Sequence, residues 1–381
     1  MKILILNPWA IFDNAIGGTE RFVEDIANAY KNLGHSVDVY MFSGKSHKKD
    51  GVNYISLDLF GKDIIADEYL IVEKFGSFST LEAYEKMADI LDNLIDVSTY
   101  DIVHLNSHFF LKLWGNKNRI ITLHSNALEF KVLWSDEEFD FMVEIMKNEA
   151  RNYKTKFVCP SLYYKNEWEK ILNATTYYIP HALNCDRLIC NESKEKLVKK
   201  YNLSNNKIKI LLPSRLEPIQ KQPKLILEGC AILDRKERER FQIIFTGIDE
   251  QYKQFIPELR EFAAKYNIDA KFIIFDSIAE AYKLTDLVAL PSRSESFGYS
   301  ALESLSLGIK TILTNIPTFN EIGKGNSCAY FFENNKYDLA IVLNKLLKIN
   351  NYERKNISHN WLNTYDINLF GERYIKIIEH E

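Results

Sequence analysis

Two glutamates flank a glycine turn late in the chain, in the stretch SRSESFGYSALESLSLG at residues 292–308. Glu295 lies in a loop that follows the apolar run LVALP, and Glu303 lies eight positions later in a segment with helical spacing. The backbone amides that open this helix, and that have no partner inside it, belong to Gly298, Tyr299 and Ser300. Such amides bind anions, whereas carboxylates accept strongly from hydroxyl groups. The pattern therefore favours a ligand with sugar hydroxyls beside phosphate, such as a nucleotide sugar, over an ordinary strand–loop–helix corner.

A second loop carries two cations. In SRLEPIQKQP, which follows the apolar run KILLP, Arg215 and Lys221 stand six positions apart before a predicted helix. Two fixed cations beside a helix start suit a diphosphate, and Pro218 and Pro223 stiffen the loop that carries them. Two solvated surface cations are the competing interpretation.

The first half of the chain carries weaker signals at the ends of two predicted strands. Gly17 and Gly18 stand directly before a helix, where backbone amides can approach a ligand closely. A plain flexible loop would look the same, and the pair is not the GxGxxG dinucleotide fingerprint. His124 follows the run RIITL and is placed for polar contact with a ligand, although on position alone a histidine satisfied by local hydrogen bonds is favoured.

Several other chemistries are not supported by the residues. Gly298 begins a sequence like that of a serine nucleophile elbow, but Leu302 replaces its second glycine. Cys185 and Cys190 lack the further Cys or His pair of a zinc site. The acidic run at 136–138 falls in a predicted helix and is interpreted as solvated surface, and no convincing Asp-x-Asp motif is present. Neither a metal nor another cofactor is therefore expected.

Short apolar runs alternate with amphipathic helical stretches along most of the chain, which is typical of parallel sheets covered on both faces. Strands are predicted at 2–7, 36–42, 101–107, 119–125, 156–161 and 176–180, and again at 207–214, 241–247, 270–276, 287–292 and 310–315. The polar stretch 182–206 is interpreted as a linker. The expected fold class is α/β, with two tandem doubly wound domains at 1–182 and 183–366. A final helix at about 367–381 could belong to either domain and could pack back on the first.

Composition limits the class of protein. A length of 381 residues suits two domains. A net charge of −4 with a pI near 6.1 argues against binding to nucleic acid, and the basic run at 45–49 is interpreted as a solvated loop. The N-terminal apolar run is too short for a signal peptide, no apolar segment is long enough to span a bilayer, and five scattered cysteines fit a reducing cytosol. A cytoplasmic protein is expected, and its oligomeric state is left open.

Taken together, the pattern resembles a GT-B glycosyltransferase of the retaining family 4, also described as glycosyl transferases group 1. The residues that carry the resemblance are Gly17-Gly18, His124, Arg215 with Lys221, and Glu295-x7-Glu303. The stretch PSRSESFGYSALESLSLGIKTILTN follows the family pattern over its length, and the resemblance covers essentially the whole chain. It implies two Rossmann-like domains with a deep interdomain cleft. The nucleotide-sugar donor would bind to residues 183–366 and the acceptor to residues 1–182.

The resemblance also implies roles for the individual residues. Glu295 would hold hydroxyls of the donor sugar, and Glu303 would hold those of the ribose. Arg215 and Lys221 would neutralise the leaving diphosphate, and His124 would lie beside the transferred sugar. The catalytic residues implied are His124, Arg215, Lys221 and Glu295. The donor-binding residues implied are Gly17 and Gly18, which would close over the phosphates, with Arg215, Lys221, Glu295, Phe297, Gly298, Tyr299, Ser300 and Glu303.

The activity implied is retaining, metal-independent transfer of the hexosyltransferase type (EC 2.4). The sugar would move from a nucleotide-diphosphate sugar to a hydroxyl of a saccharide or lipid-linked saccharide, in bacterial surface glycan synthesis. Peripheral association with the inner face of the membrane stays open. The alternatives are a GT-B nucleotide-sugar epimerase or phosphorylase relative, and a non-catalytic nucleotide-sugar-binding subunit. HALN at 181–184, TGID at 246–249 and Ser296 depart from the family pattern, and these departures weaken any inference about the donor.

Overall fold

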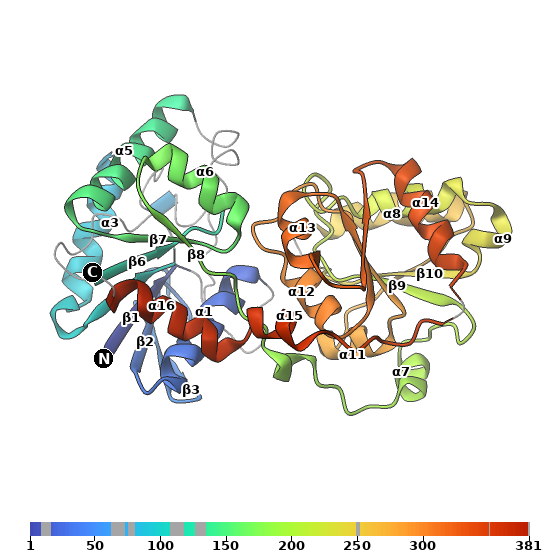
Figure 1. The fold of residues 1–381 in the computed structure, drawn as a ribbon, viewed down its shortest axis with the longest axis horizontal. Coiled ribbons are helices and arrows are strands. Elements are labelled where there is room, and N and C mark those ends of the chain that lie inside the picture. Colours follow the sequence, from blue (N-terminus) through green and yellow to red (C-terminus); the bar gives the residue numbers. More distant parts are fainter. Residues whose placement is uncertain are drawn as a thin grey trace. The chain divides into compact units, whose positions relative to one another are not determined.

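The structure is a computed structural model that describes residues 1–8, 17–61, 73–74, 81–106, 118–125, 135–248, 252–349 and 351–379. The chain divides into two compact units, each built on its own sheet (Figure 1). The N-terminal unit comprises Met1–Ala182 together with Thr364–Glu381, and the C-terminal unit comprises Leu183–Asn363. The last helix of the chain therefore belongs to the unit that contains the first strand.

The sheet of the N-terminal unit has, among the described residues, eight strands in the order β3-β4-β2-β1-β5-β6-β7-β8. Their bounds are β1 (Lys2–Asn7), β2 (Ser36–Met41), β3 (His47–Lys49), β4 (Val52–Ser56), β5 (Ile102–Leu105), β6 (Asn118–Thr122), β7 (Lys156–Cys159) and β8 (Thr176–Tyr178). Neighbouring strands are parallel except β3 and β4, which are antiparallel. Ile5 on β1 pairs with Val39 on one side and with His104 on the other, so β1 lies between β2 and β5.

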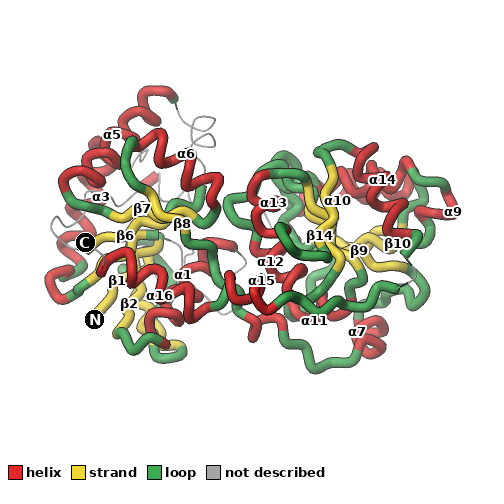
Figure 2. The backbone as a smooth tube through the Cα atoms, viewed as in Figure 1, coloured by secondary structure: helices red, strands yellow, loops and turns green. Residues whose placement is uncertain are grey.

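Helices cover both faces of this sheet, as the tube in Figure 2 shows in red against yellow strands. They are α1 (Gly18–Asn32), α3 (Leu81–Leu94), η1 (Val97–Thr99), α5 (Asp136–Asn152), α6 (Leu162–Leu172) and α16 (Ile367–Glu379). Side chains alternate along β1, so Ile3 and Ile5 pack with α1 and α16 in one core. Leu4 and Leu6 pack with α3, α5 and α6 in the other. This two-sided burial explains why the strand reads as a continuous apolar run.

The α16 helix packs closely on α1. Phe370 and Tyr374 are fully buried in the core that Phe22 and Tyr30 of α1 also enter. Gly371 permits the approach, because a Cβ at that position would lie 3.0 Å from the Cβ of Ala29. Residues that lie at opposite ends of the sequence thus complete one apolar layer.

The sheet of the C-terminal unit has six parallel strands among the described residues, in the order β11-β10-β9-β12-β13-β14. Their bounds are β9 (Ile208–Leu212), β10 (Phe241–Phe245), β11 (Asp269–Phe272), β12 (Leu287–Leu290), β13 (Lys310–Thr314) and β14 (Ala329–Phe332). The strand order reverses between β9 and β12. In an open α/β sheet, the crevice at the carboxyl ends of two such strands is where ligands bind.

The connections of this unit contain η3 (Cys185–Leu188), α7 (Lys194–Lys200), α8 (Pro223–Ile232), α9 (Arg235–Arg238), η4 (Lys253–Phe255), α10 (Ile256–Lys265), α11 (Ile278–Leu284), α12 (Tyr299–Ser306), α13 (Pro317–Gly323), α14 (Lys336–Leu347) and α15 (His359–Thr364). One core holds side chains from α8, α10 and α14 with the strands. None of the helices in the described part of the chain is long and apolar enough to cross a membrane.

The fold class expected from the sequence is confirmed, with four local differences. The sequence analysis did not predict β4, at Val52–Ser56. The run at 45–49, expected as a solvated loop, includes β3, an edge strand antiparallel to β4 on which the ring of His47 stacks against Tyr54. The series of strands does not close at 310–315, because β14 follows β13. The stretch interpreted as a linker contains α7, whose Leu197 and Val198 are buried.

Two histidines of the N-terminal unit, His104 and His181, are buried. His104 on β5 is fully buried, where its Nδ1 lies 3.1 Å from the Tyr30 hydroxyl and its Nε2 lies 2.8 Å from Thr122 Oγ1. Burial lowers the pKa of His104 to about 3. Burial also lowers the pKa of His181 well below its ordinary value. Both rings are therefore neutral in the folded protein at neutral pH.

This burial predicts that acid destabilises the N-terminal unit. Between a folded-state pKa near 3 and an unfolded-state value near 6.5, the unfolded chain binds more protons, so stability falls as pH falls through that window. His104→Gln keeps a donor and an acceptor near Tyr30 and Thr122 but does not titrate. The slope of unfolding free energy against pH should drop by about 1.4 kcal/mol per pH unit between pH 4 and 6 in this variant.

Hydrogen exchange of the β5 and β6 amides, corrected for the intrinsic effect of pH, measures this slope. His359→Gln, which changes an exposed histidine, should leave the slope as it is in the wild type. Equal slopes for His104→Gln and the wild type would contradict the prediction.

Candidate functional site

Two loops of the C-terminal unit meet where the strand order reverses. Residues 213–222 follow β9, and residues 291–298 follow β12. The Arg293 amide donates to the Gln220 carbonyl at 2.7 Å, and Gln220 Nε2 donates to the Ser294 carbonyl at 3.2 Å. The Ser300 hydroxyl at the start of α12 donates to the Pro213 carbonyl at 2.9 Å. These bonds hold the two sequence-predicted loops together as one surface.

Glu295 and Lys221 form an ion pair at this junction. Lys221 Nζ lies 2.7 Å from Glu295 Oε1, and the two side chains are only 14% and 13% exposed. The same carboxylate oxygen accepts from the Ser292 hydroxyl at 2.7 Å, while Thr318 Oγ1 donates to the Glu295 carbonyl at 2.7 Å. The carboxylate and the cation that the sequence predicted are thus in direct contact, and hydroxyl groups hold both the side chain and the carbonyl of Glu295.

Glu217 sets the shape of the loop that presents the lysine. Its carboxylate accepts from the amides of Ile219, Gln220 and Lys221. Arg215 stands apart from the ion pair, with an exposed side chain whose guanidinium carbon lies 5.8 Å from the centroid of the Tyr252 ring. The two cations therefore differ: Lys221 is held by a carboxylate, and Arg215 lies on an aromatic face.

Gly298 and Glu303 define the start of α12. Gly298 has φ +97°, in the left-handed region, and a Cβ there would lie 2.8 Å from the ring of Phe319, so glycine is required. Glu303 is 5% exposed and accepts at Oε2 from the hydroxyl of Tyr282, which is fully buried on α11. The second glutamate is thus oriented by a tyrosine that sequence reasoning did not identify.

Phe297 and Tyr299 have a packing role. Phe297 is buried, and its ring meets the Tyr299 ring edge-on with centroids 5.3 Å apart. The structure therefore assigns Phe297 to the support of the glycine turn, and its expected contact with the donor remains a prediction.

Gly17, Gly18 and His124, the site residues predicted in the first half of the chain, lie in the N-terminal unit. Gly17 is the N-cap of α1 and Gly18 its first residue. His124 follows β6 by two residues, and its Nε2 lies 2.6 Å from Asn106 Oδ1. The His124 ring contacts Phe22 of α1 with centroids 4.7 Å apart. One helix thus joins the glycine pair to the histidine.

Tyr282, Ser292, Thr318 and Asn106 are the partners that the sequence analysis missed. Ser292 could have been found, since it is a polar residue directly after a buried strand and three positions before Glu295. Tyr282 and Thr318 reach the site from α11 and α13, and only the folded chain brings them there.

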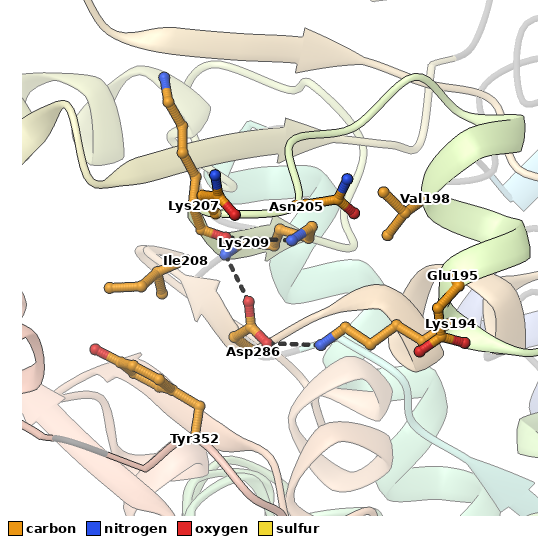
Figure 3. A pocket seen from close by; sticks show the side chains of 10 residues that line it. Lys194, Glu195, Val198, Asn205, Lys207, Ile208, Lys209, Asp286 and Tyr352 are labelled. Carbon is orange, nitrogen blue, oxygen red and sulfur yellow. Dashed lines mark hydrogen bonds and ion pairs between the residues drawn. The ribbon is translucent and has the colours of Figure 1, made fainter.

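A separate pocket of about 320 Å³ lies at the other edge of the same sheet (Figure 3). It is lined at the amino ends of β9 and β12 by Lys209 and Asp286, whereas the glutamates follow the carboxyl ends of these strands. Asp286 accepts from Lys194 Nζ at 2.8 Å and from the Lys209 amide at 2.9 Å, so its charge is already balanced. The pocket is not part of the candidate site.

Over the ranges that the structure describes, no group of three or more His, Cys, Asp or Glu side chains is arranged to hold a metal ion. The acidic run at 136–138 instead opens α5, where Ser135 and Glu138 form a capping box.

Known families match the chain over both units. The family described as "Glycosyltransferase Family 4" matches residues 16–212, and "Glycosyl transferases group 1" matches residues 193–361. The chain belongs to glycosyltransferase family 4. It is therefore a nucleotide-sugar-dependent glycosyltransferase, of a family that retains the anomeric configuration of the transferred sugar.

The chain is also similar to individual proteins and to solved structures. Mannosylfructose-phosphate synthase from Agrobacterium fabrum is 21% identical over 369 residues, which cover 87% of this chain and 79% of that protein. Among solved structures, sucrose-phosphate synthase from Thermosynechococcus elongatus aligns over 99% of this chain and 98% of that chain, with 14% identity and a TM-score of 0.77. HepE from Anabaena, solved in complex with UDP-glucose, aligns over the full length of both chains with 16% identity and a TM-score of 0.70. These structures show that the family 4 chain has the GT-B fold.

The contact between Tyr282 and Glu303 predicts a stability effect. Tyr282→Phe keeps the ring but removes a 2.8 Å bond to a buried carboxylate, so unfolding free energy should fall by about 1.5–3 kcal/mol. Tyr201→Phe is the matched control, because its hydroxyl donates to Glu280, a carboxylate that Lys200 also contacts. That control should cost about 1 kcal/mol or less. Urea unfolding of the full chain measures both, and equal losses would contradict a special role for Tyr282.

Proposed function

We propose that this protein transfers a hexose from a nucleotide-diphosphate hexose to a hydroxyl of a saccharide or lipid-linked saccharide. The observation that carries the proposal is the Lys221–Glu295 ion pair beside the start of α12, at the point where the strand order of the C-terminal unit reverses. Ligands of open α/β sheets bind at such points. The pair combines a cation for phosphate with a carboxylate for sugar hydroxyls.

A bound donor would replace the internal ion pair with better-matched contacts. The diphosphate offers Lys221 more negative charge than one carboxylate does, and Arg215 adds a second cation after the same strand. Glu295 would then accept from hydroxyls of the donor sugar, while the Ser292 hydroxyl keeps its 2.7 Å bond to Oε1. Cations and backbone amides placed where the leaving diphosphate gains charge would lower the barrier to transfer.

Glu303 would bind the ribose of the donor. Tyr282 occupies Oε2 of this carboxylate, so the orientation of the side chain is set before any ligand arrives. In the N-terminal unit, His124 would contact the transferred sugar. Burial lowers its pKa to about 3, so the ring would contact the sugar in its neutral form.

Similar proteins support a hexose donor and a saccharide acceptor. HepE is described with UDP-glucose, and another structure that aligns over the full length of both chains, at 16% identity and a TM-score of 0.71, is WaaG, described as a glycosyltransferase involved in lipopolysaccharide biosynthesis. For this chain, both the hexose and a place in bacterial surface glycan synthesis at the cytoplasmic face of the membrane are part of the proposal.

Removal of either member of the ion pair should abolish transfer. Lys221→Ala should lower kcat/KM by about 10²-fold or more, since preorganised positive charge at the leaving group is lost. Glu295→Ala should lower it by about 10²-fold or more as well, since the carboxylate that would accept from the donor-sugar hydroxyls is lost. Lys224→Ala is the matched control, because Lys224 lies three residues away and pairs with the exposed Glu258; its activity should match the wild type. Initial rates with a panel of nucleotide hexoses, screened first by thermal shift, measure the effect. Wild-type turnover in Lys221→Ala or Glu295→Ala would refute the site.

The same panel tests the reaction itself. Transfer to a saccharide acceptor with retained configuration is the expected product. Release of a free sugar that has the other configuration at one carbon would indicate an epimerase, and binding without any turnover would indicate a non-catalytic subunit.

Activity should survive the removal of divalent metals. Lys221, Arg215 and the α12 amides would supply the positive charge that a metal provides elsewhere. Rates after dialysis against EDTA should equal the rates before it. A loss that Mg²⁺ or Mn²⁺ restores would contradict the proposed mechanism.

A further inference from the structure

Three polar side chains stand in a row at the carboxyl edge of the N-terminal sheet. Asn7 ends β1, Asn106 follows β5 by one residue, and His124 follows β6 by two. These strands are direct neighbours in the sheet, and the strand order reverses between β1 and β5. The row therefore occupies in this unit the kind of position that Lys221 and Glu295 occupy in the other.

Two hydrogen bonds connect the row. Asn106 Nδ2 donates to Asn7 Oδ1 at 2.8 Å, and Asn106 Oδ1 lies 2.6 Å from His124 Nε2. Asn7 is 0% exposed and Asn106 is 2% exposed. A carbonyl oxygen can only accept, so His124 Nε2 must donate and carries the proton. In this arrangement the Asn106 amide donates to Asn7 and presents its oxygen to the histidine.

The remaining nitrogen of the ring is left as an acceptor. With the proton on Nε2, Nδ1 of His124 carries a lone pair and can accept a hydrogen bond, and the ring is half-buried. An acceptor at this position suits a hydroxyl group and not a phosphate oxygen.

The surroundings keep the ring neutral. Burial alone lowers the pKa of His124 to about 3. The titratable groups that face it in the described part of the chain are His181, with ring centroids 5.4 Å apart, and His104, both of which are themselves neutral. Phe22 packs against it from α1, and Tyr374 of α16 lies beyond His104. A carboxylate in place of Asn106 would favour the imidazolium, which has no acceptor nitrogen.

We propose that Asn106 and Asn7 are positioning residues that hold His124 as the neutral Nε2–H tautomer, so that Nδ1 accepts from a hydroxyl of the transferred sugar. The inference rests on the proposed function for the identity of the hydroxyl. The tautomer itself depends only on contacts within the N-terminal unit and can be measured without any reaction.

Nuclear magnetic resonance of the full chain labelled with ¹⁵N-histidine reads the tautomer directly. His124→Gln identifies the His124 signals by their disappearance. In the wild type, Nε2 should be protonated, Nδ1 unprotonated, and neither should change between pH 5.5 and 8.5. Asn106→Ala and Asn7→Ala should give a mixture of tautomers. Asn53→Ala is the matched control, because it removes a 2.7 Å amide bond to Asp38 in the same sheet and should leave the His124 signals unchanged.

The variant Asn106→Asp tests whether Asn106 positions His124 or only stabilises the fold. This nearly isosteric change places a carboxylate beside Nε2, so His124 should titrate within the measured pH range, and kcat/KM should be lost as pH falls through that new pKa. Above it the variant should recover activity, whereas Asn106→Ala should lose about tenfold at every pH, which is the value of one hydrogen bond.

The outcomes distinguish the two proposals. Protonation at Nδ1 in the wild type, or a pH profile of Asn106→Asp that matches the wild type, would overturn the positioning role while transfer activity stands. A wild-type protein with the Nε2–H tautomer and no transfer from any donor would overturn the proposed function and leave the assigned tautomer intact.

Discussion

The reversal of strand order between β9 and β12 is the constraint on which the arrangement of the C-terminal unit depends. Connections from two adjacent parallel strands leave in opposite directions at this point, so their loops cannot cover the strand ends and instead line a crevice. Lys221 belongs to one loop and Glu295 to the other, and their 2.7 Å contact joins the two loops. A backbone bond from Arg293 to Gln220 and a bond from the Ser300 hydroxyl to the Pro213 carbonyl keep the two loops together. The site therefore follows from topology and needs only a few specific side chains.

The N-terminal unit also has a reversal of strand order, but the side chains at that point are uncharged. Its strand order reverses between β1 and β5, and the side chains delivered there are Asn7 and Asn106, with His124 from the next strand. Burial disfavours charge on every histidine nearby. One unit thus presents charge suited to phosphate, and the other presents uncharged donors and acceptors suited to hydroxyls. This division agrees with membership of a family that handles nucleotide sugars.

Sequence patterns predicted the strands well because nearly all of them are buried on both faces and appear as short apolar runs. They failed for β3, where the charged edge strand HKK has no apolar signal. They also failed for β4 and β14, most of whose side chains are only partly buried. Glu295 and Glu303 were found because their spacing around a glycine turn is local. Tyr282, Thr318 and Asn106 were not, because each reaches its partner through a contact between elements that lie apart in the sequence. The motif did not reveal that Phe297 is buried, and its expected contact with the donor stays a prediction.

The return of α16 to the N-terminal unit has a consequence for the order in which the protein can mature. During synthesis the N-terminal unit emerges first, yet Phe370 and Tyr374, which fill the layer over Phe22 and Tyr30, are made only after the whole of the C-terminal unit. That apolar layer stays open while all of residues 183–363 are translated. The C-terminal unit, whose segment is continuous in the chain, can finish folding before the unit that precedes it. A chain interrupted just after residue 363 would have one completed unit and one exposed core, a natural substrate for chaperones.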